Sequence, residues 1–278
     1  MTTLDKSPLR WCGGKTRLLD TLEERVPASI THYFEPFMGG AGLFFRLTAR
    51  RRILRWTACL SDSSPALVNA FFWLRKSRTH VMSAYRGFPV TEEAFGEARK
   101  LATTDGVLGA AAFLFVNTYG FNGLWRVNGR GECNVPWGKR PTSGDKADLF
   151  LEAGCRLNKF LMGAPRCEDF AVACAQAKKL ALNGRSVFVY MDPPYMPTKE
   201  KAFDGYVSGG FSADDHGRVA VVARQLVEVG ARVMISNVDT PEVRAMYTGF
   251  RVTPVEVRRS VAASSSKRVS ASEVIVEG

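Results

Sequence analysis

The residues with the clearest chemistry stand at the end of a short apolar run, VFVYMDPPY, at residues 187–195. An apolar segment of this kind is typical of a buried strand, and it stops on the carboxylate of Asp192. Pro194 holds Pro193 in an extended conformation, and neither proline has an N–H to donate. The stretch therefore presents two kinds of acceptor, the Asp192 carboxylate and the Pro193 carbonyl, beside the ring of Tyr195.

Acceptors beside an aromatic ring suit an exocyclic amine on a flat heterocycle. The N6 amine of adenine is a poor nucleophile because its lone pair is delocalised into the ring. Two acceptors on its two N–H groups favour a pyramidal nitrogen, which can attack a methyl group bound to a sulfonium. Inside a stacked duplex the amine is out of reach, so the base has to be flipped out. The alternative is a strand-terminating turn that merely buries a carboxylate.

A glycine-rich turn containing Gly39, Gly40 and Gly42 separates a predicted strand from a predicted helix. Such glycines let the backbone come close to a ligand beneath the positive end of the helix. Phe45 stands where a nicotinamide-binding fingerprint needs its third glycine. Asp62 follows about twenty residues later, at the end of a second strand, and suits ribose hydroxyls. The pattern fits S-adenosylmethionine, although turns of this kind also occur only for packing.

A second glycine turn, CGGKT at residues 12–16, ends like a phosphate-binding loop. The first glycine of that motif would fall at Leu9, and no strand precedes it, so an NTPase is disfavoured. A tight turn before a helix at 16–22 explains the glycines. It does not explain the flanking Trp11 and Lys15, which are candidates for contacting a ligand over the sheet edge.

The order of predicted elements indicates an α/β sheet interrupted by a helical segment. Strands at 33–37 and 56–60, with a helix at 43–51 between them, open a doubly wound sheet. The interruption contains predicted helices at 66–75 and 107–116 and a helix capped by Thr91. The α/β rhythm then resumes near Leu149. The remaining predictions are strands at 187–191, 232–236, 250–257 and 273–276 and helices at 213–229 and 241–247.

One hairpin is predicted inside the helical segment, at about residues 124–137. Asn128-Gly129 lies between two short runs there and favours a type I′ turn, which needs two residues that accept positive φ. We therefore divide the chain into a Rossmann-like core, residues 1–64 and 148–278, and a mainly helical insertion, residues 65–147, which carries the hairpin.

Composition restricts the class of protein further. The 278 residues are 46% hydrophobic, with a net charge of +11, so a sizeable core and a polyanionic partner are expected. The six cysteines form no CxxC pair and the three histidines are scattered, which favours reduced thiols and no metal site. We find no signal peptide and no apolar run long enough to cross a bilayer, and we expect a cytoplasmic protein.

Four blocks of sequence resemble the Dam-type, class α (D12) family of DNA adenine-N6 methyltransferases. They are RWCGGK at 10–15, FEPFMGGAG at 34–42, NTYGFNGLWRVNGRGECNVPWG at 117–138 and MDPPY at 191–195. ISNVDT at 235–240 and VRRS at 257–260 add weaker similarity. The blocks run across nearly the whole chain in that family's order, and the third is long and idiosyncratic.

The resemblance implies a Rossmann-like methyltransferase core with an inserted target-recognition domain, acting on double-stranded DNA in a bacterial nucleoid or a phage-infected cell. We expect a monomer, with a dimer on DNA as the alternative, and no metal. S-adenosylmethionine would be converted to S-adenosylhomocysteine. The residues expected around this cofactor are Phe37, Gly39, Gly40, Gly42, Asp62 and Asp192, with Trp11 and Lys15 close by. The residues expected to be catalytic are Asp192, Pro193, Pro194 and Tyr195.

The resemblance also implies a set of DNA contacts. Phe121 and Asn122 would enter the space left by the flipped adenine, and Arg10 would read the first base pair. Leu124, Arg126 and Pro136 would lie in the major groove. The guanidinium of Arg126 suits O6 and N7 of guanine, although phosphate binding is the alternative. Arg258 and Arg259 would meet phosphates.

Lys139 departs from the family pattern, because relatives that read GATC carry an arginine there. Lysine cannot form the bidentate fork of arginine, so the expected site is GATC or a relaxed or related sequence. Rival interpretations are an RNA adenine-N6 methyltransferase, a protein-glutamine methyltransferase, which usually has Asn where Asp192 stands, and a DNA-binding relative without catalysis. The sequence leaves open whether the methylation serves host regulation, acts beside a restriction enzyme or belongs to a phage.

Overall fold

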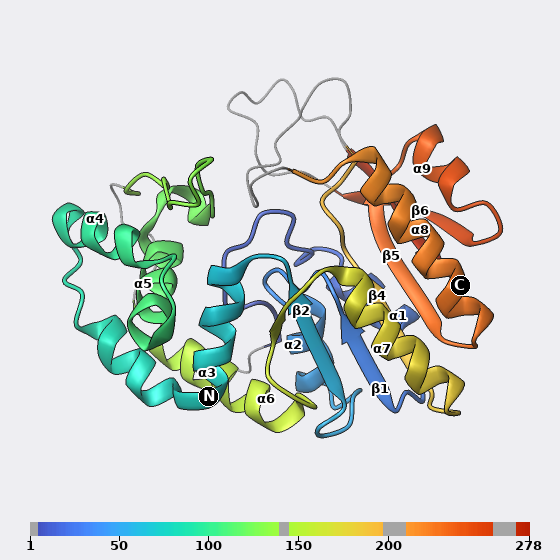
Figure 1. The fold of residues 1–278 in the computed structure, drawn as a ribbon, viewed down its shortest axis with the longest axis horizontal. Coiled ribbons are helices and arrows are strands. Elements are labelled where there is room, and N and C mark those ends of the chain that lie inside the picture. Colours follow the sequence, from blue (N-terminus) through green and yellow to red (C-terminus); the bar gives the residue numbers. More distant parts are fainter. Residues whose placement is uncertain (1–4, 139–144, 197–209, 258–270) are drawn as a thin grey trace.

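The structure is a computed structural model that describes residues 5–138, 145–196, 210–257 and 271–278. Its centre is a seven-stranded sheet with the order β3-β2-β1-β4-β5-β7-β6 (Figure 1). The strands are β1 (His32–Glu35), β2 (Ala58–Asp62), β3 (Arg166–Cys167), β4 (Val187–Met191), β5 (Arg232–Val238), β6 (Arg251–Val257) and β7 (Ala271–Glu277). The sheet of the expected methyltransferase core is thus present.

Strands β3, β2, β1, β4 and β5 are parallel, and β7 runs antiparallel to its neighbours β5 and β6. Phe34 in β1 pairs with Cys59 in β2 on one side and with Val189 in β4 on the other. The chain therefore changes direction of winding between β1 and β4. In an open α/β sheet a crevice for ligands forms outside the carboxyl ends of the strands at such a point.

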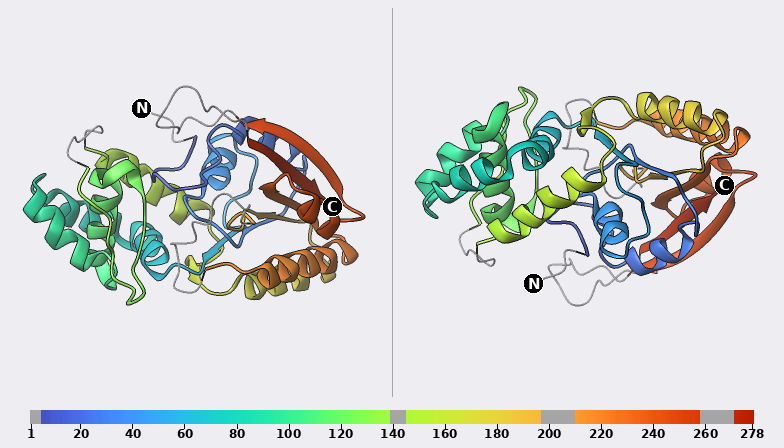
Figure 2. Two further views of the ribbon diagram at one scale, coloured as in Figure 1. Left: turned by 90° about the horizontal axis from the view of Figure 1, so that it is seen from above. Right: turned by 90° about the horizontal axis from the view of Figure 1, so that it is seen from below.

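Both faces of the sheet are covered, and the strand residues alternate between two hydrophobic clusters. In β4, Phe188 packs with the cluster that contains α1 (Leu19–Arg25) and α2 (Gly42–Ala49). Val189 packs with the opposite cluster, which contains α7 (Phe170–Leu182), α8 (Ala213–Glu228) and α9 (Pro241–Met246). Figure 2 shows these two sets of helices on opposite sides of the sheet. This burial on both faces explains the apolar run at 187–191.

Beside the sheet lies a helical unit, which consists of α3 (Pro65–Arg86), α4 (Glu92–Leu101), α5 (Gly106–Tyr119), the 3₁₀ turn η1 (Phe121–Gly123) and α6 (Ala147–Phe160). Helix α5 is buried along its whole length from Gly109 onward, as its uniformly apolar sequence predicts. Thr91 caps α4 by accepting a hydrogen bond from the Ala94 N–H. Helix α3 is longer than the predicted 66–75 because it continues past a break at Ser77.

The hairpin is present, but its turn differs from the predicted type I′ turn. Val127 and Cys133 form an antiparallel bridge, and the turn closes with the Gly131 N–H donating to the Asn128 carbonyl at 2.9 Å. The residue with positive φ is Gly131, at +78°, and neither Asn128 nor Gly129 has one. The Asn128 side chain accepts from the Arg130 and Glu132 N–H groups, which stabilises a three-residue loop with a glycine bulge.

Two predicted boundaries are also wrong. The helix predicted at 16–22 begins only at Leu19, after a turn. The strand predicted from Trp56 is β2, which begins at Ala58. Trp56 has a φ of +62° and therefore cannot extend the strand. None of the helices in the described part of the chain combines the length and apolar character needed to cross a membrane.

Candidate active site

Three neighbouring parallel strands end at the same edge of the sheet and bring together the sequence motifs. Asp62 ends β2, the glycine-rich turn follows β1, and Asp192 follows β4. These strands are adjacent in the order β2-β1-β4. Because their carboxyl ends coincide, segments separated by more than a hundred residues in sequence form one site.

The glycine-rich turn is tied to the end of β2. The Gly39 N–H donates to Oδ2 of Asp62 at 3.0 Å, and the Ser64 N–H donates to Oδ1 at 3.0 Å. Gly39 has a φ of +44°, and a Cβ there would lie 2.8 Å from the Trp11 indole. Burial raises the pKa of Asp62, whereas these backbone N–H groups oppose the rise. The carboxylate therefore holds the turn close beneath Trp11.

Aromatic rings form a wall beside this turn. Phe37, which is partly exposed, stacks on Phe170 with 5.0 Å between ring centroids. The ring of Phe211 meets Phe37 edge-on at 5.7 Å. The wall thus combines residues that follow β1, begin α7 and precede α8. A partly exposed ring in such a wall can contact a flat heterocycle.

Lys15 reaches the motif that the sequence predicts to be catalytic. Its Nζ lies 2.9 Å from Oδ1 of Asp192, and the two side chains are 9% and 19% exposed. The same Nζ lies 4.6 Å from the centroid of the Tyr195 ring. Burial raises the pKa of Asp192, and the Lys15 ammonium opposes that rise. Lys15 was predicted near the cofactor, and it lies against Asp192, which was predicted both to contact the cofactor and to hold the base.

Glu273 is a site residue that the sequence reasoning missed. The Tyr195 hydroxyl donates to Oε2 of Glu273 at 2.6 Å, and Glu273 is only 8% exposed on β7. Burial, together with the Asp192 and Glu273 carboxylates, raises the pKa of Tyr195 well above its ordinary value. The available signal was a carboxylate at the start of the apolar run Val274-Ile275-Val276.

A second buried acid lies under the site, at the end of β1. Glu35 is 2% exposed, and its Oε2 accepts a hydrogen bond from the Tyr33 hydroxyl at 2.8 Å. Burial raises the pKa of Glu35 from 4.5 to about 8, and the Asp192 carboxylate raises it further, whereas the Tyr33 bond opposes the rise. Glu35 therefore holds its proton through most of the neutral range.

The residues predicted to contact DNA beyond the catalytic edge follow α5. Phe121 is 50% exposed, Asn122 is exposed with a φ of +53°, and Pro136 is exposed while Leu124 is half-buried. Arg126 is exposed on the hairpin, but its guanidinium is bonded to Asn134 across the turn: Nε donates to Oδ1 at 2.6 Å and Nη2 to the carbonyl at 3.2 Å.

Arg10 links the sheet edge to the helical unit. Its backbone N–H donates to Oδ1 of Asn117 at 3.1 Å, and Nδ2 of Asn117 donates to its carbonyl at 2.6 Å. Trp11 packs against Phe113 of α5, with ring centroids 6.4 Å apart. The segment that carries Lys15 is therefore anchored by α5.

Three predicted DNA contacts, Lys139, Arg258 and Arg259, lie outside the described residues. Within the described ranges, no group of three or more His, Cys, Asp or Glu side chains is arranged to hold a metal ion.

The fold and this strand-end site define an α/β protein of the Rossmann-like methyltransferase class. The chain belongs to the D12 class N6 adenine-specific DNA methyltransferase family, whose model matches residues 11–261, and it is therefore an adenine-specific DNA methyltransferase that uses S-adenosylmethionine.

Similar curated proteins include the DNA adenine methylases of Salmonella typhi, 33% identical, and Escherichia coli (strain K12), 32% identical; both alignments cover 96% of this chain and 93% of the relative. The Type II methyltransferase M1.LlaDCHI of Lactococcus lactis subsp. cremoris is 30% identical over 96% of this chain and 93% of its own length.

The residues at the strand ends fit S-adenosylmethionine. Gly39 leaves a cradle under Trp11 that a Cβ would fill. The Asp62 and Asp192 carboxylates offer acceptors for the ribose hydroxyls and the ammonium group of the cofactor. Phe37 offers an apolar ring, and none of the described segments at this edge forms a dedicated phosphate-binding loop. This donor and acceptor set matches a cationic nucleoside better than a dinucleotide.

Replacing Glu35 with Gln should change how stability depends on pH. The pKa of Glu35 in the folded chain, about 8, lies above the ordinary value of 4.5. Its contribution to the free energy of unfolding is therefore fully present below pH 4.5 and is lost as the pH rises toward 8. Urea unfolding of both proteins should show Glu35→Gln gaining stability relative to the native chain between pH 5 and pH 8. A difference that does not vary with pH would contradict the raised pKa.

Proposed function

We propose that the Asp192-Pro193-Pro194-Tyr195 segment binds a flipped-out adenine of duplex DNA and directs its N6 toward the methyl group of S-adenosylmethionine. The observation that carries this proposal is the contact of Lys15. An N–H donor already lies 2.9 Å from the Asp192 carboxylate and 4.6 Å above the Tyr195 ring. An amine stacked over the tyrosine and bonded to the carboxylate is the arrangement that N6 of adenine requires.

The chain's own groups supply orientation and charge. The Asp192 carboxylate and the Pro193 carbonyl would accept one N–H each from the amine, which favours a pyramidal nitrogen with an available lone pair. S-adenosylmethionine supplies an electrophilic methyl carbon on a positively charged sulfur. As the N–C bond forms, the C–S bond breaks, and the amine then loses one proton, for which Asp192 is the nearest acceptor. The other product is S-adenosylhomocysteine, and no metal is needed.

Lys15 has to yield its place when the base enters. Its ammonium balances the charge of a carboxylate that is only 19% exposed, and burying an unpaired charge is costly. In the absence of substrate the ammonium therefore favours the ionised form of Asp192, against the burial that raises the pKa of this carboxyl. The hydrogen bond from Tyr195 to Glu273 holds the ring at a fixed angle for stacking.

We assign recognition of the DNA to the part of the helical unit that falls within the proposed target-recognition domain at 65–147, which leaves nearly all of α6 (Ala147–Phe160) in the proposed core. Phe121 is half exposed on a short turn directly after the buried α5, so it and Asn122 can enter the duplex at the vacated position. Arg126, Leu124 and Pro136 would face the major groove. The proposed target is GATC or a related sequence, with Arg10 contacting the first base pair and Lys139, Arg258 and Arg259 contributing outside the described residues.

We further propose that the protein acts as a monomer, or as a dimer on DNA, in the bacterial nucleoid or a phage-infected cell. Its net charge of +11 supports attraction to DNA at low salt, where neutralised phosphates release counterions.

The decisive test is methylation of genomic DNA by the purified chain, followed by single-molecule mapping of modified bases. We expect N6-methyladenine within one short sequence.

Asp192→Ala should lower kcat by at least about 100-fold because the amine loses its acceptor, while S-adenosylmethionine still binds in equilibrium dialysis. Asp214→Ala, an exposed acid on α8, is the matched control and should retain activity. Substantial methylation by Asp192→Ala would refute the assigned role.

Replacing Lys15 with Gln should shift the pH dependence of catalysis. Lys15 lowers the pKa of Asp192, and only the ionised carboxylate accepts from the amine, so removing the ammonium moves the ascending limb of kcat/KM to higher pH. The measurement is kcat/KM between about pH 6 and pH 8.5. Lys15→Arg should return the ascending limb of the kcat/KM profile to its native pH. If the limb of Lys15→Gln stays at the native pH, Lys15 does not act on Asp192.

Arg126→Ala should relax the choice of base at a single position. A bidentate contact to guanine is worth about 1–3 kcal/mol of discrimination. The measurement compares kcat/KM on duplexes that carry each substitution of the target sequence. Arg130→Ala, at the exposed tip of the same hairpin, is the control and should lower kcat/KM equally on all the duplexes. A uniform loss in Arg126→Ala would indicate a phosphate contact instead.

A further inference from the structure

The loop between α2 and β2 carries a concentration of positive charge that the methylation site does not use. Residues 50–55 read RRRILR. Arg50, Arg51 and Arg55 are exposed. Arg52 is partly buried and donates to the Val26 carbonyl at 3.0 Å. The loop thus directs three of its four guanidinium groups outward.

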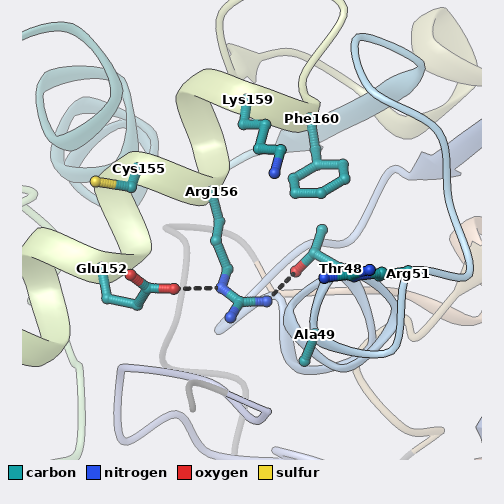
Figure 3. Close-up of a pocket in the computed structure, with 8 residues that line it drawn as sticks. All are labelled: Thr48, Ala49, Arg51, Glu152, Cys155, Arg156, Lys159 and Phe160. Atoms are coloured by element: carbon teal, nitrogen blue, oxygen red, sulfur yellow. Dashed lines mark hydrogen bonds and ion pairs between the residues drawn. The ribbon is translucent and has the colours of Figure 1, made fainter. Parts of the chain in front are cut away.

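The C-terminal part of α6 extends this charge across a hollow of about 440 Å³ (Figure 3). Arg156 lies in the hollow, with its side chain 14% exposed; its Nε is bonded to Glu152 at 2.8 Å and its Nη1 to the Thr48 hydroxyl at 3.3 Å. Arg51 and Lys159 line the same hollow. Glu152 therefore neutralises Arg156 but leaves two exposed cations at the rim.

We call Arg50, Arg51, Arg55 and Lys159 the rear cationic surface. Within the described residues, no carboxylate lies at ion-pair distance from any of the four. Mutual repulsion of unpaired like charges destabilises the folded chain slightly, and a bound polyanion relieves it.

The surface is built on an ordered frame. The Arg52 N–H donates to the Leu47 carbonyl at 2.9 Å, and the Thr57 N–H donates to the Phe160 carbonyl at 3.1 Å. These bonds tie the loop to the ends of both α2 and α6. The cations therefore start from fixed backbone positions, which lowers the entropy lost when they bind a ligand.

This surface lies at the edge of the sheet opposite to the catalytic edge. The loop enters β2 at Ala58, whereas the methylation site begins where β2 ends, at Asp62. Five strand residues span about 16 Å. Figure 1 shows α6 at the lower edge of the molecule and the hairpin segment after α5 at the upper edge. A straight duplex seated at the catalytic edge cannot also lie against the rear cationic surface.

We propose that the rear cationic surface binds the phosphate backbone of a second segment of duplex DNA while the first occupies the methylation site. The hollow alone would suit a small anion, but Arg50 and Arg55 lie outside its lining. Four exposed cations, two of them beyond the hollow, fit a chain of phosphates better than a single one, and neutralising phosphates releases counterions. Holding two segments raises the local concentration of new target sites on a long DNA.

The test compares Arg51→Glu/Lys159→Glu with the native chain. The matched control is Lys179→Glu/Arg251→Glu, which makes the same change of charge at exposed positions on α7 and β6. A short duplex with one target site is titrated into each protein at low salt, and the number of duplexes bound is measured by sedimentation. We expect two duplexes on the native chain and on the control, and one on the rear-surface variant.

A second measurement distinguishes this proposal from the methylation site itself. On the short duplex, kcat of the rear-surface variant should stay within about twofold of the native value, whereas the number of sites methylated per encounter on a long DNA should fall about fivefold. Binding of one duplex by the native chain, equal behaviour of the two double variants, or stronger competition for the rear surface by single-stranded RNA than by duplex DNA would each overturn the proposal. A thermal unfolding transition will be recorded for each variant to check that it is folded.

Discussion

Parallel pairing of β1 with β2 on one side and with β4 on the other brings three chain segments to one edge of the sheet. The turn after β1, the acid that ends β2 and the motif that follows β4 all depend on this pairing. Its strength comes from side chains buried on both faces, such as Phe188 and Val189, which pack into opposite clusters. A shift of one residue in β4 would exchange these faces and move Asp192 away from the edge.

Asp62, Asp192 and Glu35 follow or end three adjacent strands at this edge, and each is accommodated differently. Asp62 accepts backbone N–H groups from Gly39 and Ser64, so it serves as a fixed support for the turn. Asp192 is paired with the Lys15 ammonium, a partner that can leave. Glu35 accepts a hydrogen bond from the Tyr33 hydroxyl, which does not offset its burial, so it stays protonated to about pH 8. The environments distinguish a support for the turn, the proposed reactive group and a protonated buried acid among groups of the same chemistry.

The helical unit is connected to the site through Asn117, which binds the Arg10 backbone from the end of α5. The unit proposed for recognition and the residues proposed for catalysis are therefore joined by the short segment that also carries Lys15. A change in the position of α5 on DNA would reach the Asp192 pair through this segment. The rear cationic surface lies on the loop between α2 and β2 and on the C-terminal part of α6, at the opposite edge of the sheet from this segment.

The sequence by itself determined the local features: the apolar run that stops on Asp192, the glycine-rich turn, the buried α5 and the existence of the hairpin. These follow from side-chain periodicity and turn chemistry, which act over a few residues. Only the tertiary structure decided that Lys15 meets Asp192 and that Tyr195 donates to Glu273. Such contacts depend on strand order and register, which local propensities do not encode.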